Sequence, residues 1–248
     1  MTNVPIIGKL IDKLLFQGDD IIYLTQDKII PVNQNVEKQA DMVLPSRVLE
    51  YFINKANLHF IMHSCICRES MDCKNYPKDL GCLFMGSGVL DINSHLGKIV
   101  SKEEALKHAK KCREVGLIHL IGRNKLDKQW LGVKDGTKLL TVCNCDPCCC
   151  LWRIAPILTP RIGSKVTKMP GVKVKVNEKC SGCGICTKNI CFVNAINLIG
   201  KRAYINHNCK GCGRCVLVCP QKAIKLTIDD DEFVKKSIER IDKLVNIT

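Results

Sequence analysis

The sequence lacks any apolar run long enough to cross a bilayer. A transmembrane helix needs about 20 consecutive apolar residues, and charged residues interrupt every apolar stretch of this 248-residue chain well before that length. The first residues also lack the charged start, apolar centre and small-residue cleavage site of a signal peptide. We therefore expect a cytoplasmic protein without a transmembrane segment.

The usual nucleotide-binding fingerprints are also missing. Gly86-Ser-Gly88 lacks the third glycine and the helix start of the G-x-G-x-x-G turn, and no P-loop is present. The sequence therefore gives no sign of a flavin, dinucleotide or ATP site of a known pattern, and an ATP-driven step would need a partner.

Acidic and aromatic residues are scarce. The chain has 38 Lys and Arg against 24 Asp and Glu, a formal net charge of +14, and only 5% aromatic residues. A basic protein can bind nucleic acid, but the basic runs here contain no interleaved aromatics and no recognition motif. We expect no nucleic-acid partner.

Cysteine, in contrast, is abundant, with 18 residues. Disulfides need an oxidising compartment, so in a reducing and anaerobic cytoplasm we expect these thiols to bind metal. Eight of them form two runs related to C-x2-C-x2-C-x3-C-P, the pattern that ligates iron–sulfur clusters. The first run contains Cys180, Cys183, Cys186 and Cys191, and the second contains Cys209, Cys212, Cys215 and Cys219.

The two runs are offset by 29 residues and differ at one end. The second run ends in Pro220, whereas the first has one extra residue before Cys191 and Phe192 in place of proline. In such doubled runs the fourth cysteine ligates the other cluster. This rule predicts two [4Fe–4S] clusters, one held by Cys180, Cys183, Cys186 and Cys219, the other by Cys209, Cys212, Cys215 and Cys191. Two zinc ribbons are the alternative, since C-x2-C pairs also bind zinc.

Residues 172–227 resemble the bacterial-type ferredoxin domain with two [4Fe–4S] clusters. The resemblance implies a small α+β fold with pseudo-twofold symmetry. Residues 172–176 alternate in the manner of an edge strand, and residues 223–228 are its expected partner.

A second cysteine set precedes this domain. It combines a C-x-C-R loop at Cys65-Ile-Cys67-Arg68, a C-L-x-x-G segment at Cys82, and a C-N-C-x-x-C-C-C run that begins at Cys143. Over residues 43–227 these motifs resemble an uncharacterised family of cysteine-rich, ferredoxin-domain proteins from anaerobic microbes. The resemblance implies an architecture rather than an activity.

We expect nine of these cysteines to bind metal, because adjacent free thiols oxidise readily and ligation protects them. They are Cys65, Cys67, Cys73, Cys82, Cys143, Cys145, Cys148, Cys149 and Cys150. Nine thiolates suffice for two cubanes with one to spare, for one larger cluster, or for one cluster and a zinc ion. The alternative to metal binding is a loop whose cysteines are reduced and have no ligand. Cys112 lies on the apolar face of a helix, where we expect a buried core thiol.

Periodicity, caps and turn residues predict the remaining elements. Residues 5–16 form an amphipathic helix that packs on the core or a partner, with a membrane-surface anchor as the alternative. Further helices are expected at 43–57, 101–115 (opened by a capping box at Ser101) and from 229 onward. Strands are expected at 21–24, 28–32, 58–62 and 117–121, and a hairpin at 130–134 and 138–142 around Asp135-Gly136.

These elements predict an α+β protein with a mixed helix and hairpin N-terminal domain and a ferredoxin-like C-terminal domain. We expect a cysteine-rich domain at 1–158, a linker at 159–171, the two-cluster domain at 172–228 and a C-terminal helix at 229–248.

The predicted function is electron transfer, through two [4Fe–4S] clusters and at least one further N-terminal cluster built from both cysteine groups. The alternative is a reductase or activase subunit whose N-terminal cluster acts on a substrate. That alternative needs an open iron and nearby acid or base groups, for which the candidates are His59, His63, His95, His108 and His119. A single histidine is more often structural than catalytic.

The ferredoxin-like segment is itself basic, with ten Lys and Arg against one Glu. We expect an acidic redox partner to dock there, because complementary charge steers association. The expected docking residues are Lys201, Arg202, Lys210 and Arg214. Basic residues that only maintain solubility are the alternative.

Overall fold

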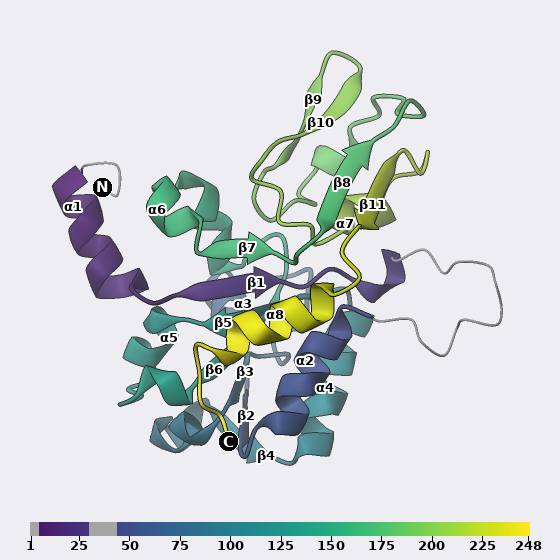
Figure 1. Cartoon of the computed structure of the whole chain (residues 1–248). Coiled ribbons are helices and arrows are strands. Elements are labelled where there is room, and N and C mark those ends of the chain that lie inside the picture. Colours follow the sequence, from purple (N-terminus) through teal and green to yellow (C-terminus); the bar gives the residue numbers. More distant parts are fainter. Residues whose placement is uncertain (1–4, 30–43) are drawn as a thin grey trace.

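The computed structural model describes residues 5–29 and 44–248, and it confirms the α+β class (Figure 1). The body of the protein is built on one seven-stranded sheet, with strand order β4-β2-β3-β6-β5-β1-β7. Its strands are β1 (Asp20–Tyr23), β2 (His59–Met62), β3 (Leu83–Met85), β4 (Gly97–Val100), β5 (Ile118–Arg123), β6 (Leu140–Cys145) and β7 (Val166–Lys168).

The described strands of this sheet pair antiparallel, apart from the parallel pair β1 and β7. Strand alternation divides the core in two. Ile22 and Leu24 face a core shared with helices α2 (Ser46–Lys55), α4 (Lys102–Glu114) and α8 (Phe233–Asp242). Ile21 and Tyr23 face the opposite core, which contains several cysteines.

Local signals explain the helices on the first face. Ser101 caps α4 by accepting a hydrogen bond from the backbone N–H of Glu104, whose carboxylate accepts from the Ser101 N–H, so the expected capping box is present. Cys112 is fully buried on the inner side of α4, as expected. Helix α8 is held to β1 by two hydrogen bonds of 2.6 and 2.8 Å from the Arg240 guanidinium to the Asp20 carboxylate.

The N-terminal helix is present but changes pitch. Helix α1 (Pro5–Ile11) continues into a π-helical turn at Asp12–Phe16. The buried Asp12 carboxylate in this turn accepts hydrogen bonds from Arg161 and Lys165, and Phe16 is buried in the cysteine-containing core. The inner end of the helix therefore packs on the body. No helix within residues 5–29 and 44–248 is long and apolar enough to cross a membrane.

The C-terminal module consists of two small antiparallel sheets. Strand β8 (Val172–Val176) pairs with β11 (Ile224–Ile228), as predicted, and β9 (Ile196–Ile199) pairs with β10 (Arg202–Ile205). The module rests on the large sheet beyond β1 and β7 (Figure 1). Direct hydrogen bonds join the two parts: the Thr25 hydroxyl donates to the Gly211 carbonyl (2.9 Å), and the Gln26 N–H donates to the Cys212 carbonyl (3.3 Å).

The predicted hairpin at 130–142 is wrong. Helix α5 (Lys125–Trp130), capped by Asn124, ends where the first strand was predicted to begin, and the described residues between it and β6 (Leu140–Cys145) contain no strand. Asp135 accepts from the N–H and hydroxyl of Thr137, which forms a 3-10 turn at Gly136–Lys138 instead of a two-residue hairpin turn. Strand β6 follows and pairs with β3 and β5.

Two other predictions need correction or fall outside the description. Residues 159–171 do not form a free linker, because they contain α6 (Pro160–Gly163) and β7, which pairs with β1. Of the strand predicted at 28–32, the residues up to 29 belong to a 3-10 turn at Asp27–Ile29, and the rest lies outside the described residues.

The cap of α4 provides a stability test. Ser101→Ala removes a side chain that satisfies a helix N–H, so the free energy of unfolding should fall by about 1 kcal/mol. Anaerobic urea unfolding followed by circular dichroism measures it. Lys107→Ala, at an exposed position of the same helix, is the control and should change stability little. Equal stability of both variants and the wild type would contradict a working cap.

Candidate metal centres

The first module site joins cysteines from both runs. Cys180, Cys183, Cys186 and Cys219 line one small cavity. Two of these sulfurs accept backbone hydrogen bonds, from Ala203 N–H to Cys180 Sγ (3.4 Å) and from Ala223 N–H to Cys219 Sγ (3.3 Å). Such bonds stabilise thiolates, which are the form that ligates iron. The grouping is the one that crossed ligation requires.

The tight loop of this site depends on a glycine. Gly182 has φ +71°, and a Cβ atom there would lie 2.5 Å from the Lys201 carbonyl oxygen. Only glycine tolerates both the conformation and the approach. The turn between β9 and β10 therefore lies directly against the cysteine loop.

The second module site has the same construction. Cys191, Cys209, Cys212 and Cys215 line its cavity. The Ala195 N–H donates to Cys191 Sγ at 3.2 Å, which is the counterpart of the Ala223 bond to Cys219 four residues along each run. The extra residue before Cys191 therefore leaves that thiol within the site.

Phe192 connects this site to the large sheet. Its ring is 1% exposed and meets the Tyr23 ring edge-on, with centroids 5.7 Å apart. The Arg214 guanidinium lies 5.9 Å from the Phe192 ring centroid and donates to the Gly116 carbonyl and the Tyr76 hydroxyl, both at 2.6 Å. Proline would fill much less of this interface, which explains the departure from the usual motif.

The nine N-terminal cysteines divide into two groups. Six of them line a cavity of about 420 Å³ on the cysteine-containing face of the sheet. They come from the start of α3 (Ile66–Ser70), from the residue before β3, from the end of β6 and from the last position of the triple-cysteine run. These six are Cys65, Cys67, Cys82, Cys143, Cys145 and Cys150.

Hydrogen bonds between the thiols of this cavity distinguish those that donate a proton from those that accept one. Cys150 donates to Cys145 across 3.0 Å. Hydrogen bonds from Cys145 and Cys82 hold the pKa of Cys143 well below its usual value. A hydrogen bond from Cys67, helped by the Arg68 charge, lowers the pKa of Cys65 to about 7. Cys65 and Cys143 are therefore the thiols that ionise most easily, and thiolates are what a metal cluster binds.

The arginine of the C-x-C-R motif holds both cysteine loops in place. Arg68 is 0% exposed, and its guanidinium donates to the Asn144 carbonyl (2.8 Å), the Asp146 carboxylate (3.2 Å) and the Leu80 carbonyl. The two loops lie side by side because β3, which follows the first, pairs with β6, which precedes the second. The two cysteine groups therefore lie close together, although β3 separates β2 from β6 in the sheet.

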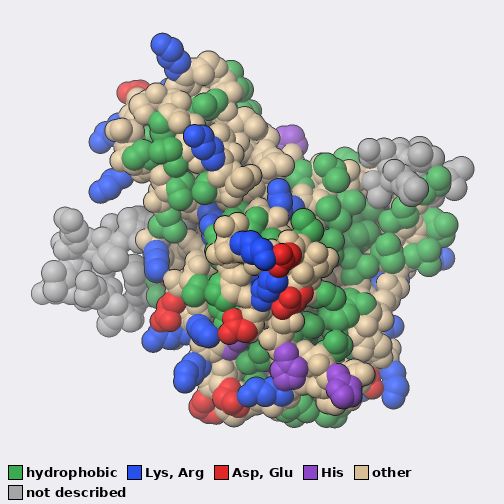
Figure 2. Space-filling model, turned by 180° about the vertical axis from the view of Figure 1, so that it is seen from behind, with side chains coloured by type: hydrophobic (Ala, Val, Ile, Leu, Met, Phe, Trp, Pro, Cys, Tyr) green, Lys and Arg blue, Asp and Glu red, His purple; other side chains and the backbone are tan. Residues whose placement is uncertain are grey.

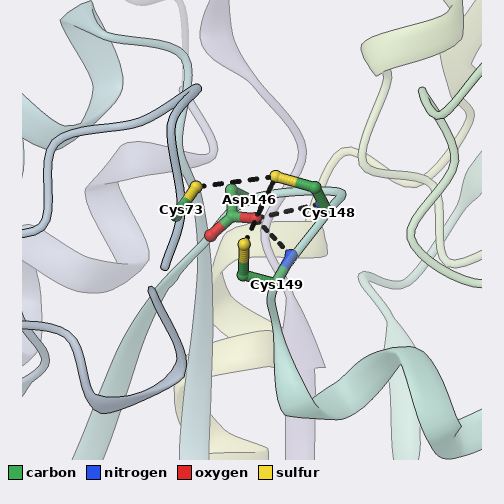
Figure 3. A group of neighbouring side chains, drawn as sticks. All are labelled: Cys73, Asp146, Cys148 and Cys149. Carbon is green, nitrogen blue, oxygen red and sulfur yellow. Dashed lines mark hydrogen bonds between the residues drawn. The ribbon is translucent and has the colours of Figure 1, made fainter. Parts of the chain in front are cut away.

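The other three cysteines do not line the cavity, and they gather around Asp146, a residue that does line it. Cys73, Cys148, Cys149 and Asp146 have their ligand atoms within 4.8 Å of one another (Figure 3). Cys73 Sγ is 3.8 Å from Cys148 Sγ, which is 3.5 Å from Cys149 Sγ. The triple-cysteine run is thus divided: Cys150 lines the cavity, whereas Cys148 and Cys149 lie beside Cys73.

The candidate histidines do not line the cavity in the described structure. His119 is buried, and its Nδ1 lies 2.7 Å from Asn144 Oδ1, while desolvation lowers its pKa to about 3. His108 lies 2.9 Å from the Gly81 carbonyl and His59 2.7 Å from the Ile53 carbonyl. His63 and His95 are exposed. These contacts indicate structural roles for the three bonded histidines.

Asp127 is the residue that the sequence did not reveal. It lines the cavity with Trp130 and Trp152, and desolvation raises its pKa to about 7, with a contribution from Cys143. No spacing signal marks it, and it belongs to α5, a short helix that the sequence analysis did not predict.

Two runs of four thiols with N–H donors define an iron–sulfur binding module. The comparison with known families agrees: residues 187–229, which include the last five cysteines, match the LdpA Fe-S cluster-binding domain. No curated protein and no solved structure gives a match to the chain. The C-terminal part is therefore an iron–sulfur cluster-binding domain.

The Arg68 and Asp146 pair gives a second prediction. Arg68→Met leaves a buried carboxylate without its counter-charge, so the free energy of unfolding should fall by about 3–5 kcal/mol. Arg68→Met combined with Asp146→Asn removes the orphaned charge and should recover part of the loss. Anaerobic urea unfolding measures both. A single variant as stable as the wild type, or a double variant no better than the single, would rule out this role.

Proposed function

We propose that the protein transfers low-potential electrons through two [4Fe–4S] clusters in the module to a further iron–sulfur cluster in the six-thiol cavity. The observation that carries the proposal is the shared core between these sites. Cys145 and Cys150 of the cavity pack in the same apolar cluster as Cys191, Cys209 and Cys212 of the second module site.

The module supports two cubanes with crossed ligation. Each of its two cavities has four cysteines, three from one run and one from the other. Bound clusters would supply one-electron transfer, and backbone N–H donors to the sulfurs help set their potentials. The chain's own part is to hold the thiols, donate these hydrogen bonds and exclude water.

Tyr23 lies between the second module site and the cavity. Its side chain is 0% exposed, and its hydroxyl has no hydrogen-bond partner within the described part of the chain. Burial raises its pKa, and the nearby Cys150, Cys145 and Cys212 thiols raise it further. Thiols from both sites therefore surround one ring, which provides a short, dry path between them.

The six-thiol cavity offers more sulfur than one cubane needs. Four thiolates ligate such a cluster, and the two remaining thiols can donate hydrogen bonds to it, as Cys150 now does to Cys145. Soft thiolate ligands select iron–sulfur clusters over hard cations, which supports iron rather than magnesium or calcium at this site.

The first module site is the proposed point of exchange with a partner. Of the 18 cysteines, all within the described residues, Cys183 alone is exposed. Lys201 lies on the turn against its loop, and Arg202, Lys179 and Lys188 are also exposed. Figure 2 shows basic side chains around the outer part of the module. We propose that an acidic protein docks there.

This surface differs from the expected one. Lys210 donates to the Val166 carbonyl at 2.5 Å, and Arg214 donates to Gly116 and Tyr76. Both residues bind the module to the body, which leaves Lys201 and Arg202 from the original four for docking.

A reductase is the second candidate, and Asp127 favours it. A carboxyl group whose pKa is raised to about 7 can hold a proton near neutral pH beside the cavity. The exposed Ile66 and Trp130 and the neighbouring Leu151 form an apolar mouth for a substrate. In this version the module supplies electrons and Asp127 supplies a proton.

Crossed ligation can be tested with Cys219→Ala. It should disrupt the cluster held by Cys180, Cys183 and Cys186 and leave the other module cluster intact. EPR of the anaerobically reduced protein, together with iron and sulfide content, measures this. Cys191→Ala is the matched variant and should have the complementary effect. Loss of the Cys209, Cys212 and Cys215 cluster in Cys219→Ala would show that the pairing is wrong.

Docking can be tested with an acidic flavodoxin as the electron donor. The rate of cluster reduction in stopped-flow measurements should fall as ionic strength rises, since the screening length is only about 8 Å at physiological salt. Lys201→Glu with Arg202→Glu should lower the low-salt rate further, whereas Lys107→Glu on the distant α4 should not. This surface would be ruled out if the reduction rate changed neither with ionic strength nor in the variant that carries Lys201→Glu and Arg202→Glu.

A further inference from the structure

The three cysteines outside the cavity form a site of a different kind. We propose that Cys73, Cys148 and Cys149, with the Asp146 carboxylate as fourth donor, bind one zinc ion that is separate from the iron–sulfur clusters (Figure 3). The proposal concerns a mononuclear metal and does not require electron transfer.

The sulfur spacing fits a single metal ion. A tetrahedral zinc with Zn–S bonds of about 2.3 Å places two sulfurs about 3.8 Å apart. The Cys73 and Cys148 sulfurs are 3.8 Å apart, and those of Cys148 and Cys149 are 3.5 Å apart. In a cubane each thiolate binds a different iron, so its four sulfurs must be spread around the cluster. These three thiols are too close together for that arrangement.

This site borders the cavity at Asp146, but its three thiols are distinct from the six thiols of the cavity. None of the three cysteines lines the six-thiol cavity, although Cys150 is adjacent in sequence. The buried Arg68 guanidinium lies against the carboxylate on one side, donating to Asp146 Oδ2. The ion pair of Arg68 and Asp146 is therefore next to both sites, whereas each thiol is part of only one of them.

The aspartate is already oriented as a ligand. Asp146 Oδ1 accepts from the N–H groups of Cys148 (3.0 Å) and Cys149 (2.6 Å) and from the Cys148 thiol (3.0 Å). These backbone bonds fix the turn that presents both sulfurs, in the way that outer hydrogen bonds orient metal ligands. Zinc would take the place of the thiol proton at Oδ1.

Zinc would offset most of the charge that ligation creates, and the sum over the four ligands, zinc and Arg68 is −1. Binding releases three thiol protons to solvent and leaves three thiolates and one carboxylate, a charge of −4. Zinc contributes +2 and Arg68 contributes +1. Without the ion, three thiolates and a carboxylate within 4.8 Å of one another would repel strongly. Soft sulfur ligands in a tetrahedral set favour zinc over magnesium or calcium.

The test uses full-length protein purified anaerobically from zinc-containing medium. Metal analysis should find about one zinc per chain in the wild type, and zinc K-edge X-ray absorption should give three sulfurs at about 2.3 Å. Cys149→Ala and Cys73→Ala should each lose most of the zinc and keep the wild-type sulfide content. Cys112→Ala, which removes a buried thiol outside both groups, should keep both zinc and sulfide.

Three results would overturn the proposal. The first is wild-type protein without zinc, and the second is zinc with only nitrogen and oxygen neighbours. The third is a loss of sulfide with the zinc in the Cys73 and Cys149 variants, while Cys112→Ala retains it, because these cysteines would then serve a cluster. Sulfide content also reports folding in each variant, and failure of the electron-transfer proposal would leave the zinc result unaffected.

Discussion

The N-terminal half depends on one buried guanidinium. Arg68 has no exposure to water, so its donors must find acceptors inside the protein or carry a large desolvation cost. The acceptors come from Leu80, Asn144 and Asp146, which belong to two loops far apart in the sequence. The Nη1 and Nη2 groups of Arg68 make these bonds, which bring the first cysteine loop against the second, whereas its Nε has no acceptor among the described residues. The β3–β6 pairing fixes the register of the strands, and the hydrogen bonds of Arg68 fix the positions of the two loops relative to each other.

The same constraint accounts for how the nine thiols divide. Asp146 Oδ2 accepts a hydrogen bond from Arg68, and Asp146 Oδ1 accepts from the backbone N–H groups of Cys148 and Cys149. Cys150, one residue later, turns back toward Cys145. The Arg68–Asp146 ion pair therefore lies between the six-thiol cavity and the group formed by Cys73, Cys148 and Cys149.

Sequence patterns predicted the parts of the fold that local chemistry determines. The capping box at Ser101, the alternation in β8 and the cysteine spacing in the module reflect interactions between near neighbours. The hairpin predicted around Asp135 is absent from the described residues, because Asp135 accepts hydrogen bonds from Thr137 in a 3-10 turn and, of its two predicted strands, only β6 is present. The partition of the N-terminal cysteines depends on Arg68 reaching across 78 residues to Asp146, and no spacing within either loop encodes that contact. Asp127 was missed because its position at the cavity also depends on tertiary packing, which no local spacing encodes.

Strand β7 determines how the module can move. It pairs with β1 at the edge of the large sheet, and only residues 169–171 separate it from β8. A carrier domain on a free linker swings between donor and acceptor, and its exchange rate depends on that search. Here Phe192, Arg214 and the β7 pairing hold the module against the body. Electron transfer between the proposed clusters would then need no domain swing, and only an external partner would have to diffuse.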